Sequence, residues 1–293
     1  MKASLFEKLM VSRKKRLQRL KNNVVKYLSS LSENELKEDQ KQVLQFLTKN
    51  DIAVFPYEFT RKYNPTDIPL FYDTARKLLY TPWEGGNLYY KNGTQKEKAQ
   101  RYFNSLRLEQ DILSPHRYLT EDFNVLENDV IVDVGAAEGN FSLSVIEKAK
   151  HIYLFEPEKD WVKALEATFA PWKHKVTIIQ KFISDKTSDN SITLDDYFNK
   201  NQLINFIKAD VEGAEGSLLR GATNLIQRHK NLKIAVTTYH SQEDALLLES
   251  IVKEAGFTAS FSDGYMLFYY GKENVVKEPY LRKAVLRAVK KIG

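Results

Sequence analysis

The second half of the chain alternates between short apolar runs, typical of buried strands, and longer segments with helical periodicity. This alternation predicts a mostly parallel sheet with helices on both faces and with ligands bound at the carboxyl ends of its strands. Two closely spaced apolar runs end the pattern and predict an antiparallel final hairpin. We therefore expect an α/β fold built on a seven-stranded sheet. The expected strands are 130–134, 152–155, 176–180, 204–208, 232–237, 257–261 and 265–270, and the expected helices are 140–150, 159–169, 215–228 and 242–255.

The rest of the chain predicts appendages to this sheet. Residues 1–114 are expected to form a helical and irregular N-terminal extension, with a basic amphipathic helix at 10–31 and aromatic-rich loops at 55–93. The sheet domain is expected at 115–271, followed by a basic amphipathic C-terminal helix at 272–293. Large aromatic side chains in the loops either pack against the domain or offer a sugar ring a stacking surface: Trp83, Tyr89 and Tyr90.

The positive charge of the chain lies at its two ends. The formal net charge is +6, but residues 1–30 carry +8 and residues 272–293 carry +5, so the remainder is acidic at −7. Two basic amphipathic ends suit peripheral contact with an anionic membrane, and the alternative is that both helices pack on the protein with a solvated basic face. The acidic centre disfavours nucleic acid as a partner.

Cysteine is absent from the sequence, which excludes disulfides, thiolate metal sites and cysteine nucleophiles. Charged residues interrupt the N-terminal stretch, and no apolar run approaches the roughly 18 residues that a spanning helix needs. We therefore expect a cytoplasmic protein without a transmembrane anchor.

The stretch IVDVGAAEGNFSL, at 131–143, joins the first expected strand to its helix. Asp133 ends the strand, and Gly135 and Gly139 allow the backbone to approach a ligand at the helix N-terminus. Glu156 ends the next strand, where a carboxylate can accept both hydrogen bonds of a ribose diol. The G-x-x-x-G spacing differs from the dinucleotide fingerprint, and Asp133 suits a cationic ligand. The turn therefore predicts S-adenosylmethionine rather than a nicotinamide cofactor.

Four motifs, in their order along the chain, resemble the FkbM-type S-adenosylmethionine-dependent methyltransferases: VDVGAAEGNFSL, YLFEPEKD, SITLDDYF and INFIKADVEGAEGSLLRGA. The resemblance covers residues 131–271 and implies a class I methyltransferase fold, which is Rossmann-like. It also implies O-methylation, so we expect the acceptor to be a hydroxyl of a sugar in a glycan, glycolipid or polysaccharide precursor. Its implied cofactor residues are Asp133, Gly135, Gly139, Asn140 and Phe141 on the methionine side, Glu156 on the ribose and Asp185 near the adenine.

Methyl transfer to a hydroxyl needs a base or a metal, because an alkyl hydroxyl does not ionise unaided near neutral pH. The expected ends of strands four and five carry Asp210, Glu212 and His240. His240 is the first candidate for general base and Asp210 the second, and the alternative is that His240 only caps a helix or binds a carbonyl.

The same acidic side chains admit a metal site. Asp210 and Glu212 are candidate ligands for a divalent cation such as magnesium, or they order the turn that follows the strand. A different class of function also stays open, namely a non-catalytic methyltransferase-like module that serves as a scaffold in a glycan-assembly complex.

Overall fold

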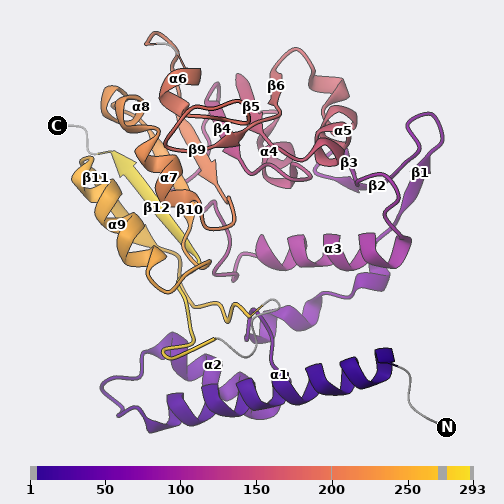
Figure 1. The fold of residues 1–293 in the computed structure, drawn as a ribbon, viewed down its shortest axis with the longest axis vertical. Helices are drawn as coiled ribbons and strands as arrows, with labels where there is room; N and C mark the ends of the chain where they lie inside the picture. The colour runs from indigo at the N-terminus through magenta and orange to yellow at the C-terminus, as the bar shows by residue number, and fades with distance from the viewer. Residues whose placement is uncertain (1–4, 199, 270–275, 291–293) are drawn as a thin grey trace.

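The computed structural model describes residues 5–198, 200–269 and 276–290, and it contains a seven-stranded sheet, which lies away from the first two helices of the chain (Figure 1). The strand order is β11, β12, β10, β9, β4, β5, β6, so the chain order reverses between β4 and β9. Neighbouring strands are parallel except at β12, which runs antiparallel to both β10 and β11. This arrangement confirms the class I methyltransferase fold. The strands are β4 (Val130–Val134), β5 (His151–Phe155), β6 (Val176–Ile179), β9 (Phe206–Ala209), β10 (Lys233–Thr237), β11 (Phe257–Phe261) and β12 (Val285–Lys290).

Both faces of the sheet are covered, because successive side chains of a strand point to opposite faces. Ile131 of the fully buried β4 packs in the cluster that contains the apolar side chains of α4 and α5. Its neighbours Val130 and Val132 pack in the cluster that contains those of α7, α8 and α9. The helices and the remaining short elements of this domain are α4 (Asn140–Val145), α5 (Lys159–Thr168), α6 (Leu194–Tyr197), α7 (Glu215–Arg220), α8 (Thr223–Arg228), α9 (Asp244–Glu254), η3 (Ala170–Trp172), β7 (Phe182–Ile183) and β8 (Ser191–Ile192).

The C-terminal part of the prediction is wrong in two respects. The strand β11 does not form a hairpin with 265–270; it pairs with β12, which lies where a helix was expected at 272–293. Val285, Leu286 and Ala288 are fully buried in the sheet, so the domain extends past residue 271. A short apolar run fits a helix and a buried strand equally well, which explains the error. Residues 270–275 and 291–293 lie outside the described part of the chain.

The N-terminal extension begins with two packed helices, α1 (Leu5–Ser30) and α2 (Glu38–Lys49), which lie together at one end of the molecule (Figure 1). The helix predicted at 10–31 is thus confirmed. Leu20, Val24 and Leu28 of α1 are buried in a cluster that also contains side chains of α2 and of the segment after β11. The apolar stripe of α1 therefore packs on the protein in this region. In the part of the chain that the structure describes, no helix has the length and hydropathy needed to cross a bilayer.

The aromatic-rich stretch at 55–93 is not all loop. It contains a three-stranded antiparallel sheet, whose second hairpin turns at Glu84 and Gly85, both with positive φ, as a type I′ turn requires. Tyr89 and Tyr90 are buried, whereas Trp83 at the hairpin end is partly exposed. The elements of this region are η1 (Glu58–Lys62), η2 (Pro65–Asp67), β1 (Phe71–Asp73), β2 (Leu78–Trp83), β3 (Gly86–Tyr89) and α3 (Lys96–Glu109).

Candidate functional site

A cavity of about 740 Å³ lies at the carboxyl ends of β4, β9 and β10, where this fold class binds its ligands. We call it the sheet-edge cavity. The helix α3 and the glycine turn after β4 form part of its wall. Five of the residues that the sequence singled out line it: Gly135, Asn140, Asp210, Glu212 and His240.

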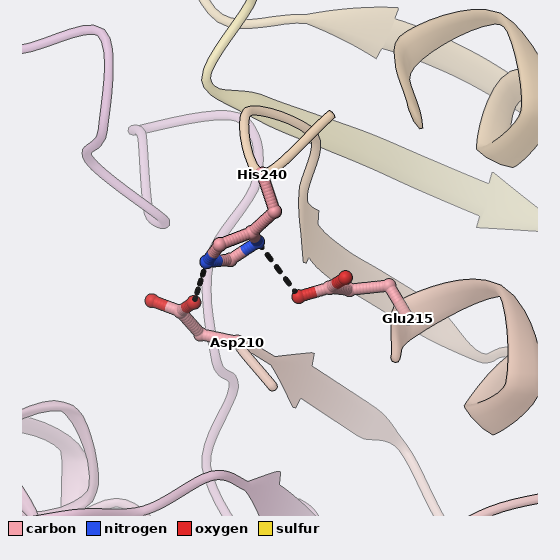
Figure 2. Close-up of side chains that lie close together, drawn as sticks. All are labelled: Asp210, Glu215 and His240. Atoms are coloured by element: carbon pink, nitrogen blue, oxygen red, sulfur yellow. Dashed lines mark ion pairs between the residues drawn. The ribbon is translucent and has the colours of Figure 1, made fainter. Parts of the chain in front are cut away.

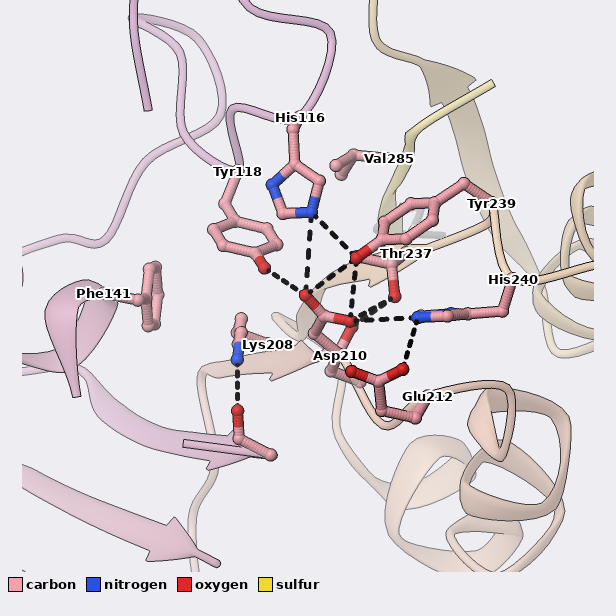
Figure 3. A network of polar contacts seen from close by, with 12 residues as sticks. His116, Tyr118, Phe141, Lys208, Asp210, Glu212, Thr237, Tyr239, His240 and Val285 are labelled. Atoms are coloured by element: carbon pink, nitrogen blue, oxygen red, sulfur yellow. Dashed lines mark hydrogen bonds and ion pairs between the residues drawn. The ribbon is translucent and has the colours of Figure 1, made fainter. Parts of the chain in front are cut away.

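Asp210, directly after β9, is the centre of a polar network (Figure 3). Its Oδ2 accepts a hydrogen bond from Tyr118 Oη at 2.9 Å, and its Oδ1 accepts one from Thr237 Oγ1 at 3.2 Å. The Nε2 atoms of His116 and His240 lie 3.6 and 3.7 Å from its two oxygens. Burial alone would raise the pKa of Asp210, but the nearby histidines and Lys208 outweigh burial and lower that pKa well below its usual range. Asp210 is therefore a fixed negative charge and a poor base.

His240, after β10, lies between two carboxylates (Figure 2). Its Nδ1 is 3.2 Å from Glu215 Oε1, and its Nε2 is 3.7 Å from Asp210 Oδ1. Burial alone would lower the pKa of His240, but contact with Glu215 and the charges of Glu215 and Asp210 raise it overall. Glu215 is itself buried, accepts a hydrogen bond from the Val211 amide, and shares the single hydroxyl proton of Thr237 with Asp210.

The geometry bears on the predicted metal site. Glu212 is 91% exposed at its side chain, and its Oε2 is 3.7 Å from His240 Nε2. The described residues close enough to share an ion are instead Asp210, Glu215 and His240, whose ligand atoms lie within 4.8 Å of one another. However, the two carboxylates face different ring nitrogens. This arrangement does not suit a chelated cation, because an imidazole binds a metal through one nitrogen.

The two glycines of the turn serve different neighbours. Gly135 has φ +70°, and a Cβ there would lie 1.9 Å from the carbonyl oxygen of Asp210, so this glycine lets the ends of β4 and β9 approach. Gly139 has φ +83°, and a Cβ there would lie 2.7 Å from Phe169 and 2.8 Å from Leu165. The second glycine therefore allows packing against α5 and does not line the sheet-edge cavity.

Asp133 and Phe141 lie outside the lining of the sheet-edge cavity. Asp133 is fully buried, accepts a hydrogen bond from Ser142 Oγ at 2.7 Å and pairs with Lys208 Nζ at 3.0 Å. Burial alone would lower the pKa of Lys208, but Asp133 and Asp210 raise it. Lys208 also donates to the carbonyl of Gly135 at 2.8 Å, so Asp133 acts on the turn through this lysine. Phe141 is a core residue that stacks on Phe206.

The two other predicted cofactor carboxylates also lie outside that lining. Glu156 is buried, and its two oxygens accept hydrogen bonds from the backbone amides of Ala137 at 2.9 Å and Glu158 at 2.8 Å. Burial raises its pKa. Asp185 is 35% exposed at its side chain and lies 3.5 Å from Arg220 Nε. Both are fixed by contacts within the protein.

Sequence reasoning missed several residues of the cavity. Glu138 lies inside the glycine turn, and its burial raises its pKa to about 7, while Tyr102 of α3 donates a hydrogen bond to it. Burial also raises the pKa of Glu109, at the end of α3. Glu138 was visible in the motif itself, whereas nothing local linked Tyr102, Glu109 or His116 to the sheet. The charged lining is predominantly acidic, with Glu109, Glu138, Asp210, Glu212 and Asp244 against Lys208 and His240.

Comparison with known proteins agrees with the motifs. Residues 170–259 match the family model of the methyltransferase FkbM domain. No match to the chain is found among curated proteins. Among solved structures, a methyltransferase FkbM from Methylobacillus flagellatus KT is 19% identical, with 66% of this chain and 53% of that chain covered and a TM-score of 0.45.

Two further solved structures are similar at a comparable level. An rRNA methylase from Streptococcus thermophilus is 17% identical, with coverage of 58% and 90% and a TM-score of 0.40. A putative methyltransferase from Streptococcus mutans, solved in complex with SAH, is 16% identical, with coverage of 56% and 90% and a TM-score of 0.40. The chain spans about half the length of the Methylobacillus protein. Residues 170–259, which match the FkbM family model, hold the ends of β9 and β10 at the sheet-edge cavity, so the part of the chain that resembles this domain is the part that forms the cavity.

Proposed function

We propose that this chain transfers the methyl group of S-adenosylmethionine to a hydroxyl of a carbohydrate. One observation carries the proposal: His240 is held between two carboxylates in a cavity next to the glycine turn, at the ligand-binding edge of a class I methyltransferase sheet. The carbohydrate acceptor rests on the resemblance to the FkbM methyltransferases.

The sheet-edge cavity fits the proposed cofactor in charge and size. Its acidic lining favours a ligand that carries a positive charge, and about 740 Å³ is within the range of ligand sites. Gly135, Glu138 and Asn140 are the turn residues that would hold the cofactor. When bound, S-adenosylmethionine supplies a methyl carbon activated by its positively charged sulfur.

His240 is placed to take the proton of the acceptor hydroxyl. Glu215, 3.2 Å from Nδ1, favours the tautomer that keeps the proton on Nδ1 and leaves the lone pair on Nε2. Nε2 is 3.7 Å from both Asp210 and Glu212, which is too long for a hydrogen bond, so this buried nitrogen has no hydrogen-bond partner among the described residues. The raised pKa makes this imidazole a stronger base once it is neutral.

Calorimetric titration with S-adenosylmethionine, S-adenosylhomocysteine and NAD tests the cofactor. We expect binding of the first two and none of NAD. The variant His240→Ala should keep that binding and lose the release of S-adenosylhomocysteine in the presence of a sugar acceptor. If neither sulfur compound binds, the proposal fails and a non-catalytic binding module becomes the better interpretation. If His240→Ala keeps full turnover, the base is another group.

A further inference from the structure

A second cavity, of about 320 Å³, lies beside the sheet-edge cavity and shares Asn140 with it. Its walls come from the end of the β2–β3 hairpin, the C-terminal end of α3 and the first turns of α4. We call it the hairpin cavity. The residues that matter for its chemistry are Tyr63, Trp83, Arg107, Gln110 and Arg117.

The hairpin cavity is basic where the sheet-edge cavity is acidic. The Arg107 guanidinium lies 4.8 Å from the centre of the Tyr63 ring, and no described carboxylate lies within ion-pair distance of it. Arg117 donates to the backbone carbonyls of Leu119 at 2.7 Å and Gln110 at 3.1 Å. Glu84 is the single acidic residue in the lining as described, and it is exposed.

Two side-chain nitrogens of the hairpin-cavity residues lack hydrogen-bond acceptors within the described part of the chain. The indole Nε1 of Trp83 and the side-chain Nε2 of Gln110 are buried, and neither has a hydrogen-bond partner among the described residues. Buried donors are normally satisfied, whereas each of these two nitrogens lacks an acceptor oxygen among the described residues. A guanidinium without a carboxylate calls for the same chemistry, because it binds carboxylate and phosphate oxygens strongly.

We propose that the hairpin cavity binds an anionic group, a carboxylate or a phosphate, on the sugar acceptor, away from the hydroxyl that is methylated. That the anion belongs to the methyl acceptor rests on the proposed function, whereas the preference of the cavity for an anion rests on its lining alone. Of the three aromatic residues that the sequence offered as a sugar-stacking surface, Trp83 is the one that lines this cavity, since Tyr89 and Tyr90 are buried elsewhere.

Opposite charge in the two cavities sorts two ligands. The acidic sheet-edge cavity favours the cationic methyl donor, and the basic hairpin cavity favours an anionic acceptor and disfavours the donor. Binding energy from a remote anionic group then helps to orient the hydroxyl at the reacting carbon.

Titration of the protein with glucuronic acid, glucose 6-phosphate and glucose, without S-adenosylmethionine, tests the proposal. At least one of the two anions should bind about tenfold more tightly than glucose, and the tighter one identifies the carboxylate or the phosphate as the preferred group. The variant Arg107→Gln should weaken anion binding about tenfold, and Arg107→Lys should weaken it less. Arg101→Gln, on an exposed position of the same helix, is the matched control and should change nothing.

Three results would overturn the proposal: glucose binding as tightly as the anions, anion binding that survives Arg107→Gln, or no binding of either anion. Thermal unfolding of each variant shows whether it is folded. If Arg107→Gln does not fold, Arg107→Lys, which preserves the charge, takes its place in the test. Because the titration contains no methyl donor, its failure is separate from a failure of S-adenosylmethionine binding. An intact donor site without anion binding removes only this subsite.

Discussion

The buried pair of Asp133 and Lys208 offers the sharpest test of how the glycine turn is held. Their side chains are 1% and 6% exposed, and Nζ lies 3.0 Å from Oδ1. The variant Lys208→Met removes the cation and leaves Asp133 ionised inside the sheet, a type of change that costs about 3–5 kcal/mol. It also removes the hydrogen bond to the Gly135 carbonyl, so we expect weaker S-adenosylmethionine binding in addition to lower stability.

The measurement is the free energy of unfolding from urea titration, in a double-mutant cycle with Asp133→Asn. Asparagine can still accept the Ser142 hydrogen bond, and the double variant leaves no unpaired charge. Its cost should therefore be about 2–3 kcal/mol less than the sum of the single costs. The pKa of Lys208 is raised above its ordinary 10.5, so the pair stabilises the protein throughout the neutral range and is lost only as the pH rises through that folded-state pKa. Additive single costs, or costs below about 1 kcal/mol, would refute the reasoning.

Three other predictions follow from the site and from α1. The turnover rate should rise with pH, with a midpoint above 6.5, because the pKa of His240 is raised and the base must be neutral. The variant Glu215→Gln should move this midpoint to lower pH, and an unchanged midpoint would mean that another group is the base. The variant Gly135→Ala should lower the free energy of unfolding, measured by urea titration, by about 1–3 kcal/mol, because its Cβ would lie 1.9 Å from a carbonyl oxygen. The control Gly93→Ala, with a similar φ and open space around its Cβ, should lower it less, and equal losses would mean that φ strain alone is the cause. Binding to anionic vesicles, measured by sedimentation, should be weak and salt-sensitive, at about 1 kcal/mol per exposed basic residue, because the apolar stripe of α1 is buried. Charge-reversing substitutions of the exposed Lys15, Arg19 and Lys26 should abolish this binding, and salt-insensitive binding would contradict the prediction.

The sheet was predictable because its strands are apolar runs separated by helices with clear periodicity. The strands β4, β5, β6, β9, β10 and β11 lie within two residues of their expected positions. The hairpin of β2 and β3 was missed because Pro82, Gly85 and Gly86 gave the stretch the composition of a loop. Local composition marks the turn correctly there, but the strands on either side are stabilised by pairing and by packing on α5.

The site was predictable only where it coincides with strand ends. Asp210 and His240 follow β9 and β10 and do meet, as the topology requires. What the sequence could not supply is the partner of each carboxylate. Asp133 was expected to face a cationic ligand, but Lys208 from the neighbouring strand already lies beside it. Glu156 similarly accepts two backbone amides, so both side chains support the turn.

The basic C-terminal segment shows that the charge of a sequence segment does not by itself predict an exposed basic surface. It was expected to present lysines and arginines to a surface, but four of them donate to backbone carbonyls: Arg282, Lys283, Arg287 and Lys290. A cation so placed satisfies carbonyls at the ends of other segments and is not available as a solvated face.

The two arginines among them bind the backbone of site residues. Arg282 donates to the carbonyls of Tyr239 at 2.5 Å and His240 at 2.9 Å, and Arg287 donates to the carbonyl of Tyr118 at 3.0 Å. The segments that carry His240 and Tyr118 are therefore both hydrogen-bonded to the same C-terminal stretch. That stretch lies beyond residues 170–259 and beyond the motifs at 131–271. The geometry of the candidate base thus depends on a part of the chain that carries none of the family motifs, because β12 lies between β10 and β11, and Arg282 just before it and Arg287 within it bind the backbone next to His240 and Tyr118.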